Sequence, residues 1–222
     1  MKKVNLFLCA AILIVMSTLT AFIGIEEKSV KRTMIKEVKI GNQIWMVENL
    51  NVDKFKNGNP IPQARTNEEW KKAAENKQPA WCYYDNDPAN GTKYGKLYNW
   101  FAVNDPRGLA PAGYHIPTDA EWTKLTDYLS GEKEAGEKMK STSGWKNNGN
   151  GTNESRFSGL PGGFRGNDAA FSYLGFGGQW WSSTENSTAT ACSHSLLFYY
   201  SGVLRIKDDK KIFGYSIRCL RD

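Results

Sequence analysis

The chain has 222 residues, with 29 Lys and Arg against 23 Asp and Glu, and 40% of its residues are hydrophobic. This composition excludes a disordered or collagen-like chain. The 21 glycines and frequent Asn, Ser and Thr favour short elements over the long periodic runs of an all-helical bundle. The net charge of +6 is not gathered into a dense basic stripe, so we expect no nucleic-acid binding.

Residues 1–25 have the pattern of an export signal. Met1-Lys2-Lys3 is followed by a mostly apolar run over residues 4–25. The run is long enough to span a bilayer, so the sequence leaves open a cleaved signal peptide or an uncleaved N-terminal anchor. We expect an exported protein, either secreted, periplasmic or at the cell surface. It would contact membrane only through this segment, if that segment is not cleaved. A polar linker over 26–33 precedes one domain, residues 34–222.

The first half of this domain combines a hairpin with short helices. Residues 34–50 alternate apolar and polar around Gly41-Asn42, which predicts a β-hairpin. Thr66 and Glu69 have capping-box spacing, which predicts a helix that begins after Thr66. Further expected elements are a strand at 80–84, an Asp/Asn/Gly loop over 85–91 and an aromatic helix or strand over 96–103.

The second half has the clearest helix and then strands. Thr118 and Glu121 form a capping box, and apolar residues recur at helical spacing over 116–130. A shorter helical segment is expected at 132–140 and a long loop at 141–163. Strands are expected near 178–183, 195–200, 203–205 and 214–220. The order of these elements favours a single α+β domain.

Several strings of the sequence carry a family resemblance. In chain order they are IGNQIWMVENLNV, YGKLYNWFAV, PAGYHIPTDAEW, SGLPGGFR, WWSSTE and GYSIRCLRD. They resemble the Fibrobacter succinogenes major paralogous domain family over residues 38–222. The resemblance implies a secreted or surface protein and no particular reaction.

A more distant likeness concerns the fold. YHIPTDAEW and GYSIRCLRD are similar to segments of formylglycine-generating and sulfatase-modifying domains. That likeness implies a C-type-lectin-like fold, with short helices packed on small twisted antiparallel sheets and the C-terminal strand beside the N-terminal hairpin. The oxygenase chemistry of those domains is not expected, because the closely spaced cysteine pair that binds copper is missing.

The cysteines allow more than one disulfide. Beyond the export segment the chain has Cys82, Cys192 and Cys219, and spacing alone does not choose among the three pairings. The family resemblance implies the pair Cys82 and Cys219, with Cys192 left over.

Aromatic residues suggest glycan binding. Sugars present apolar faces that stack on Trp or Tyr rings, while Asn, Asp and Glu bind their hydroxyls. Because neighbouring residues of a strand point to opposite faces, we expect one of Trp180 and Trp181 in the core and the other as a stacking platform. The alternative is that both tryptophans pack in the core. The candidate ligand-binding residues are Trp180, Trp181, Glu185, Asn186, Tyr199 and Tyr200.

The segment DNDPANG, residues 85–91, is a candidate calcium loop. Asp85, Asp87 and Asn90 offer oxygen ligands, but the spacing of an EF-hand fails at Ala89 and Lys96. An Asx-turn is the favoured interpretation. We therefore expect no cofactor, with calcium at these three residues as the alternative.

The sequence leads to an exported, non-enzymatic recognition module whose partner is a glycan or another cell-envelope component. One alternative is a hydrolase of polysaccharide or peptidoglycan, for which the carboxylates of Asp119, Glu121 and Glu185 would have to meet. A second alternative is a structural surface domain without a ligand.

Overall fold

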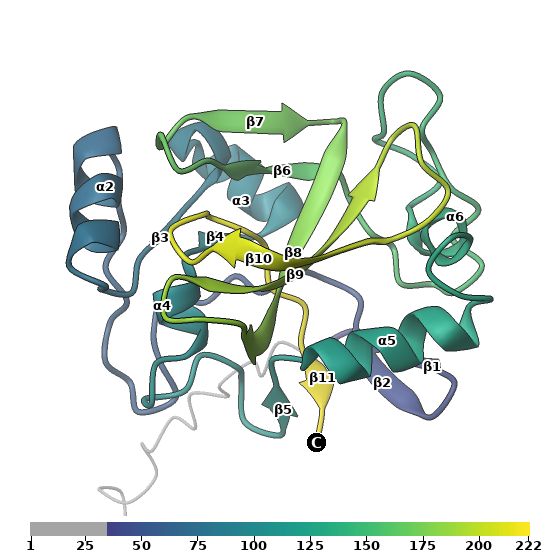
Figure 1. Ribbon diagram of the computed structural model, residues 1–222, viewed down its shortest axis with the longest axis horizontal. Coiled ribbons are helices and arrows are strands. Elements are labelled where there is room, and N and C mark those ends of the chain that lie inside the picture. The colour runs from purple at the N-terminus through teal and green to yellow at the C-terminus, as the bar shows by residue number, and fades with distance from the viewer. Residues whose placement is uncertain (1–34) are drawn as a thin grey trace, which may run out of the picture. The chain divides into compact units, whose positions relative to one another are not determined.

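Three small sheets and a set of short helices make up residues 35–222, the part of the chain that the computed structural model describes (Figure 1). The predicted export segment 1–25 and the linker 26–33 lie outside these residues. Within residues 35–222, no helix is long and apolar enough to cross a membrane. The mixture of helices and sheets confirms the α+β class.

The first sheet joins both ends of the domain. It contains β1 (Glu37–Ile40), β2 (Gln43–Met46), β11 (Leu220–Arg221) and β5 (Tyr114–His115), in the order β1-β2-β11-β5. Strands β1 and β2 form the predicted hairpin, and Gly41 in its turn has a φ of 58°, a backbone conformation that favours glycine. Leu220 pairs with Trp45 of β2, so the C-terminal strand lies beside the N-terminal hairpin, as expected.

The second sheet has the order β10-β9-β8-β6-β7. Its long central strands, β8 and β9, are antiparallel and place Trp180 opposite His194 and Trp181 opposite Ser193. Gly163 links β6 to β8; a side chain there would come within 2.5 Å of the Ser172 carbonyl oxygen, so glycine is required. The bounds are β6 (Gly162–Arg165), β7 (Phe171–Leu174), β8 (Gly177–Glu185), β9 (Thr190–Leu197) and β10 (Leu204–Lys210).

Several strand predictions differ from the structure. The strand expected at 195–200 lies earlier, as β9, because Tyr199 and Tyr200 form the turn that follows it. Strands β5, β6 and β7 were not predicted, and β6 begins inside the loop expected at 141–163. Of the strand expected at 214–220 only Leu220 lies in β11. The preceding residues make isolated bridges to three different segments, through Gly214, Tyr215 and Ser216.

Capping explains where the helices begin. Both predicted capping boxes are formed, at Thr66 before α2 (Asn67–Glu75) and at Thr118 before α5 (Asp119–Tyr128). The loop expected at 85–91 is wrong, because the Asp87 side chain caps a helix and Pro88 fits its first turn. The remaining elements are β3 (Trp81–Cys82), η1 (Tyr84–Asn86), α3 (Pro88–Tyr94), β4 (Leu97–Tyr98), α4 (Trp100–Val103) and α6 (Ala135–Met139).

The second sheet is covered on both faces. One face contributes Trp180 to an apolar cluster that contains Trp45 and Trp122, the buried tryptophan of α5. The other face contributes Trp181 to a separate cluster with Tyr98 and Trp100. This two-sided burial decides which of the candidate residues can meet a ligand.

Candidate functional site

The tandem tryptophans are core residues. Trp180 is 1% exposed and Trp181 is 0% exposed. The predicted alternation of the two side chains is present, but each face of the sheet packs against another layer, so neither ring presents a stacking face. Their indole N–H groups donate to Asn49 Oδ1 (2.8 Å) and to the Tyr98 carbonyl oxygen (2.9 Å). The prediction of a stacking platform is therefore wrong for this pair.

The other predicted binding residues do not gather in one place. Tyr199 is 68% exposed and Tyr200 is half-buried, in the turn after β9. Glu185 pairs with Ala191 at the opposite end of β9. The ends of a strand of this length are roughly 25 Å apart. Asn186 is exposed, and its side chain donates to Thr190 Oγ1 within the β8–β9 turn.

The expected disulfide is not formed. Cys82, Cys192 and Cys219 are buried free thiols. Cys82 packs in the cluster around Trp70, whereas Cys219 packs in the cluster around Trp100. Burial raises the pKa of Cys82 and of Cys219 to about 12, so both stay protonated at neutral pH.

Two of the three candidate calcium ligands, Asp87 and Asn90, make hydrogen bonds with backbone groups. The Asp87 carboxylate accepts from the Ala89 N–H as the cap of α3, and the Asn90 side chain donates to the Tyr84 carbonyl oxygen. Asp85 has a left-handed φ of 53° inside η1. Across residues 35–222, no three His, Cys, Asp or Glu side chains are grouped to hold a metal ion.

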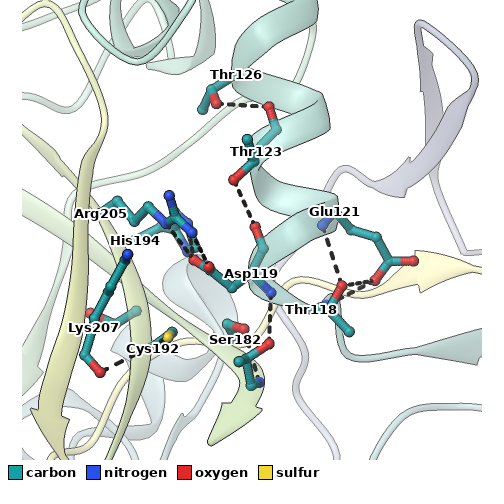
Figure 2. A network of polar contacts seen from close by, with 12 residues as sticks. Thr118, Asp119, Glu121, Thr123, Thr126, Ser182, Cys192, His194, Arg205 and Lys207 are labelled. Carbon is teal, nitrogen blue, oxygen red and sulfur yellow. Dashed lines mark hydrogen bonds and ion pairs between the residues drawn. The ribbon is translucent and has the colours of Figure 1, made fainter. Parts of the chain in front are cut away.

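Asp119 lies in a polar network between α5 and the second sheet (Figure 2). Arg205 on β10 donates through Nε and Nη2 to both carboxylate oxygens, with the Nε bond at 2.8 Å. His194 Nε2 on β9 lies 3.5 Å from Asp119 Oδ1, and its ring stacks on Trp122. The hydrogen bond from Arg205 holds the pKa of Asp119 below its usual value.

Neither Asp119 nor Glu121 is placed as a proton donor. Burial alone would raise the pKa of Glu121, but its hydrogen bonds with Thr118 and His115 lower it overall. Glu121 and Glu185 line different cavities. The three carboxylates of the hydrolase alternative therefore do not meet. Asp119 joins α5 to the sheet, and Glu121 caps α5.

Glu185 does line a cavity with aromatic and polar walls. This cavity, which we call the Glu185 pocket, has a volume of about 410 Å³. One wall is α4 with the turn after it, and the other is the turn between β8 and β9. Its residues include Trp100, Phe101, Asn104, Asp105, Glu185 and Lys211.

Three of the four charged side chains of the Glu185 pocket are paired; the fourth, Lys77, forms no ion pair within residues 35–222. The Lys211 ammonium, on a side chain that is 5% exposed, forms an ion pair with Glu185 and donates to the Thr188 carbonyl oxygen at 3.1 Å. It also lies 4.5 Å from the centre of the Trp100 ring, a cation–π contact. Asp105 accepts two hydrogen bonds from the Arg107 guanidinium and one from the Arg107 backbone N–H, and these bonds lower its pKa.

The solvent-accessible side chains of the pocket include both aromatic and polar groups. Phe101 is half-buried, Asn104 is exposed and the Glu185 side chain is 50% exposed. The sequence analysis did not single out Phe101, because segment 96–103 has the aromatic character of a buried element, and it made no prediction for Asn104. The available signal was Asn99, whose side chain caps α4: in one helical turn Trp100, Ala102 and Val103 are buried, and Phe101 between them is left half-buried.

The fold and this site define a mixed α/β domain with short helices, curled sheets and a small pocket of aromatic and polar residues. The model of one protein family, the Fibrobacter succinogenes major domain, matches residues 38–221. The chain belongs to this family. No curated protein and no solved structure matches it.

Proposed function

We propose that this protein is an exported recognition module that binds glycan in the Glu185 pocket. The observation that carries the proposal is the meeting of Phe101, Asn104 and Glu185 around one cavity, from elements far apart in the sequence. An aromatic ring can stack on the apolar face of a sugar, while amide and carboxylate groups bind its hydroxyls. Export rests on the charged and then apolar pattern of residues 1–25.

The proposal includes a C-type-lectin-like fold. It is supported by the capped, Trp-bearing helix α5 against a small sheet and by the pairing of β11 with β2. These are the features that the distant sequence likeness implies.

Binding is favoured over hydrolysis by the pairing of the pocket carboxylates. General acid catalysis needs a carboxyl group that holds its proton near neutral pH. Asp105 is bonded to Arg107, and its pKa is lowered. Glu185 is bonded to Lys211. Both side chains are therefore suited to accept hydrogen bonds from sugar hydroxyls.

A glycan-array screen of the full chain tests the proposal, run with calcium and with chelator. We expect specific binding in both conditions, because the Asp87 carboxylate already caps α3 and the Asn90 side chain already donates to the Tyr84 carbonyl oxygen. Phe101→Ala and Glu185→Gln should each weaken binding by about tenfold, the effect of one well-placed contact. Tyr199→Ala, at the far end of β9, is the matched control and should bind like the wild type.

Three results would contradict the proposal. A blank array with a folded protein would favour the ligand-free structural domain. Equal binding by the Phe101 and Tyr199 variants would exclude the Glu185 pocket as the site. Turnover of a labelled polysaccharide that stops in Glu185→Gln would favour the hydrolase.

A further inference from the structure

A second cavity has a buried guanidinium among its lining residues. This cavity, which we call the Arg218 cavity, has a volume of about 290 Å³. It lies between the segment after β2, the C-terminal part of α3 and the loop before β6. The residues that matter here are Glu48, Asn49, Thr92, Lys93 and Arg218. None of them takes part in the Glu185 pocket.

The Arg218 guanidinium is held by neutral groups. Nε and Nη2 donate to Asn49 Oδ1 at 3.1 and 2.8 Å, and Nη1 donates to the carbonyl oxygens of Met46 (3.2 Å) and Phe157 (2.6 Å). The Phe157 ring covers one side, 4.4 Å from Cζ. No carboxylate forms an ion pair with Arg218 within residues 35–222.

One donor of Arg218 is left over. A guanidinium has five N–H groups, and the bonds above account for four. The fifth, on Nη2, has no acceptor in the part of the chain that the structure describes. Arg218 is 1% exposed, and burial lowers its pKa to about 9, against the smaller opposing effects of Cys219 and Glu48.

The remaining charges at the cavity leave a positive excess. Lys93 forms no ion pair with any residue from 35 to 222; its ammonium lies 4.9 Å from the centre of its neighbour's ring, Tyr94. Glu48 is the acidic residue at the cavity, and it is paired with Lys36 at 2.9 Å. An anion in the cavity would meet two cations that have no carboxylate partner of their own.

We propose that the Arg218 cavity binds a small carboxylate. The free Nη2–H of Arg218 and the Lys93 ammonium would donate to the carboxylate oxygens. Hydrogen bonds between charged partners are stronger than those between neutral groups, so this site prefers a carboxylate to the corresponding amide. The volume limits the ligand to the size of lactate or of a single acidic sugar.

An NMR titration of the ¹⁵N-labelled full chain tests this proposal, with lactate compared with the neutral lactamide at equal ionic strength. We expect saturable shifts of the Arg218 Nε–H and of the Thr92 and Lys93 amides with lactate, and no such shifts with lactamide. Lys93→Met should weaken lactate binding by about tenfold. Lys133→Met removes the same charge from an exposed position outside the cavity and is the matched control.

Arg218 itself is a poor test residue because it also supports the core, so the affinity test rests on Lys93. Shifts that do not saturate, or equal shifts with lactamide, would overturn the proposal. So would equal lactate affinity in the Lys93 and Lys133 variants. A blank glycan array would leave the proposal standing, since it concerns different residues.

Discussion

The indole Nε1 of Trp180 donates a hydrogen bond of 2.8 Å to Asn49 Oδ1, across 131 residues of sequence. The same oxygen accepts two bonds from Arg218. Asn49 thus ties the segment after the N-terminal hairpin to the central sheet and to the C-terminal segment. All three residues lie in strings that carry the family resemblance, which indicates that these strings hold the fold together.

Trp180→Ala is therefore expected to destabilise the domain. It removes a ring that packs against Trp122 and Phe157 and leaves Asn49 Oδ1 with one donor fewer. The free energy of unfolding should fall by about 3–5 kcal/mol, as for other buried aromatic residues cut to alanine. Urea denaturation followed by circular dichroism measures it. Tyr199→Ala, on an exposed ring, should change it by less than about 0.5 kcal/mol; equal effects of the two variants would show that Trp180 is not a core residue.

Local signals predicted the local structure. Both capping boxes, at Thr66 and Thr118, and the hairpin around Gly41 depend on residues within a few positions of one another, so the sequence displays them directly. The family match confirms the resemblance that the strings carry. The α3 helix was not predicted although Asp87-Pro88 has the pattern of a helix start, because the Asp, Asn and Gly residues of this segment favoured an Asx-turn.

The candidate site could not be predicted from local sequence patterns, because it depends on contacts between distant segments. The alternation of side chains along a strand predicts that Trp180 and Trp181 point to opposite faces of the sheet. It does not predict that other elements pack against both faces. The Glu185 pocket assembles Phe101, Glu185 and Lys211 from three distant segments. Which distant segments meet is decided by tertiary packing, for which one sequence carries no direct signal.

The cysteines give a second prediction. Because Cys82 and Cys219 are buried with raised pKa values, both should resist iodoacetamide in the folded protein and react after unfolding. Mass spectrometry of an unreduced digest measures the labelling at each site. A peptide that links Cys82 to Cys219 would contradict the structure and restore the disulfide that the family resemblance implies.

His194 should make the protein less stable in acid. Burial lowers its pKa to about 3, so the folded protein keeps the ring neutral while the unfolded chain binds a proton below about pH 6.5. Stability is then lost as pH falls below 6.5, by at most about 1.4 kcal/mol per pH unit for one proton. His194→Gln should flatten this acid slope in urea denaturation between pH 4 and 6. A His194 Hε1 resonance that titrates near pH 6.5 would contradict this.

His115 should have the opposite effect on the pH dependence of stability: its contribution is lost as pH rises, not as it falls. Its Nδ1 lies 2.8 Å from Asp222 Oδ1 and its Nε2 lies 3.0 Å from Glu121 Oε1. Burial lowers the pKa of His115, but these hydrogen bonds outweigh it and the net pKa is raised. The folded protein therefore holds a proton that the unfolded chain has lost. This stabilisation is complete below about pH 6.5 and disappears as pH rises through the folded pKa.

Glu121 affects the stability at lower pH. Because its pKa is lowered in the folded protein, Glu121 stabilises the fold fully above its ordinary pKa of 4.5, and this stabilisation is lost as pH falls through the lowered value. Lys124 and Arg221 line the same cavity as His115 and Glu121. We expect His115→Gln to remove the loss of stability between pH 6.5 and 8, while His194→Gln retains it. If His115→Gln keeps the wild-type slope over this range, the imidazole does not hold the extra proton, and its contacts with Asp222 and Glu121 act only as neutral hydrogen bonds.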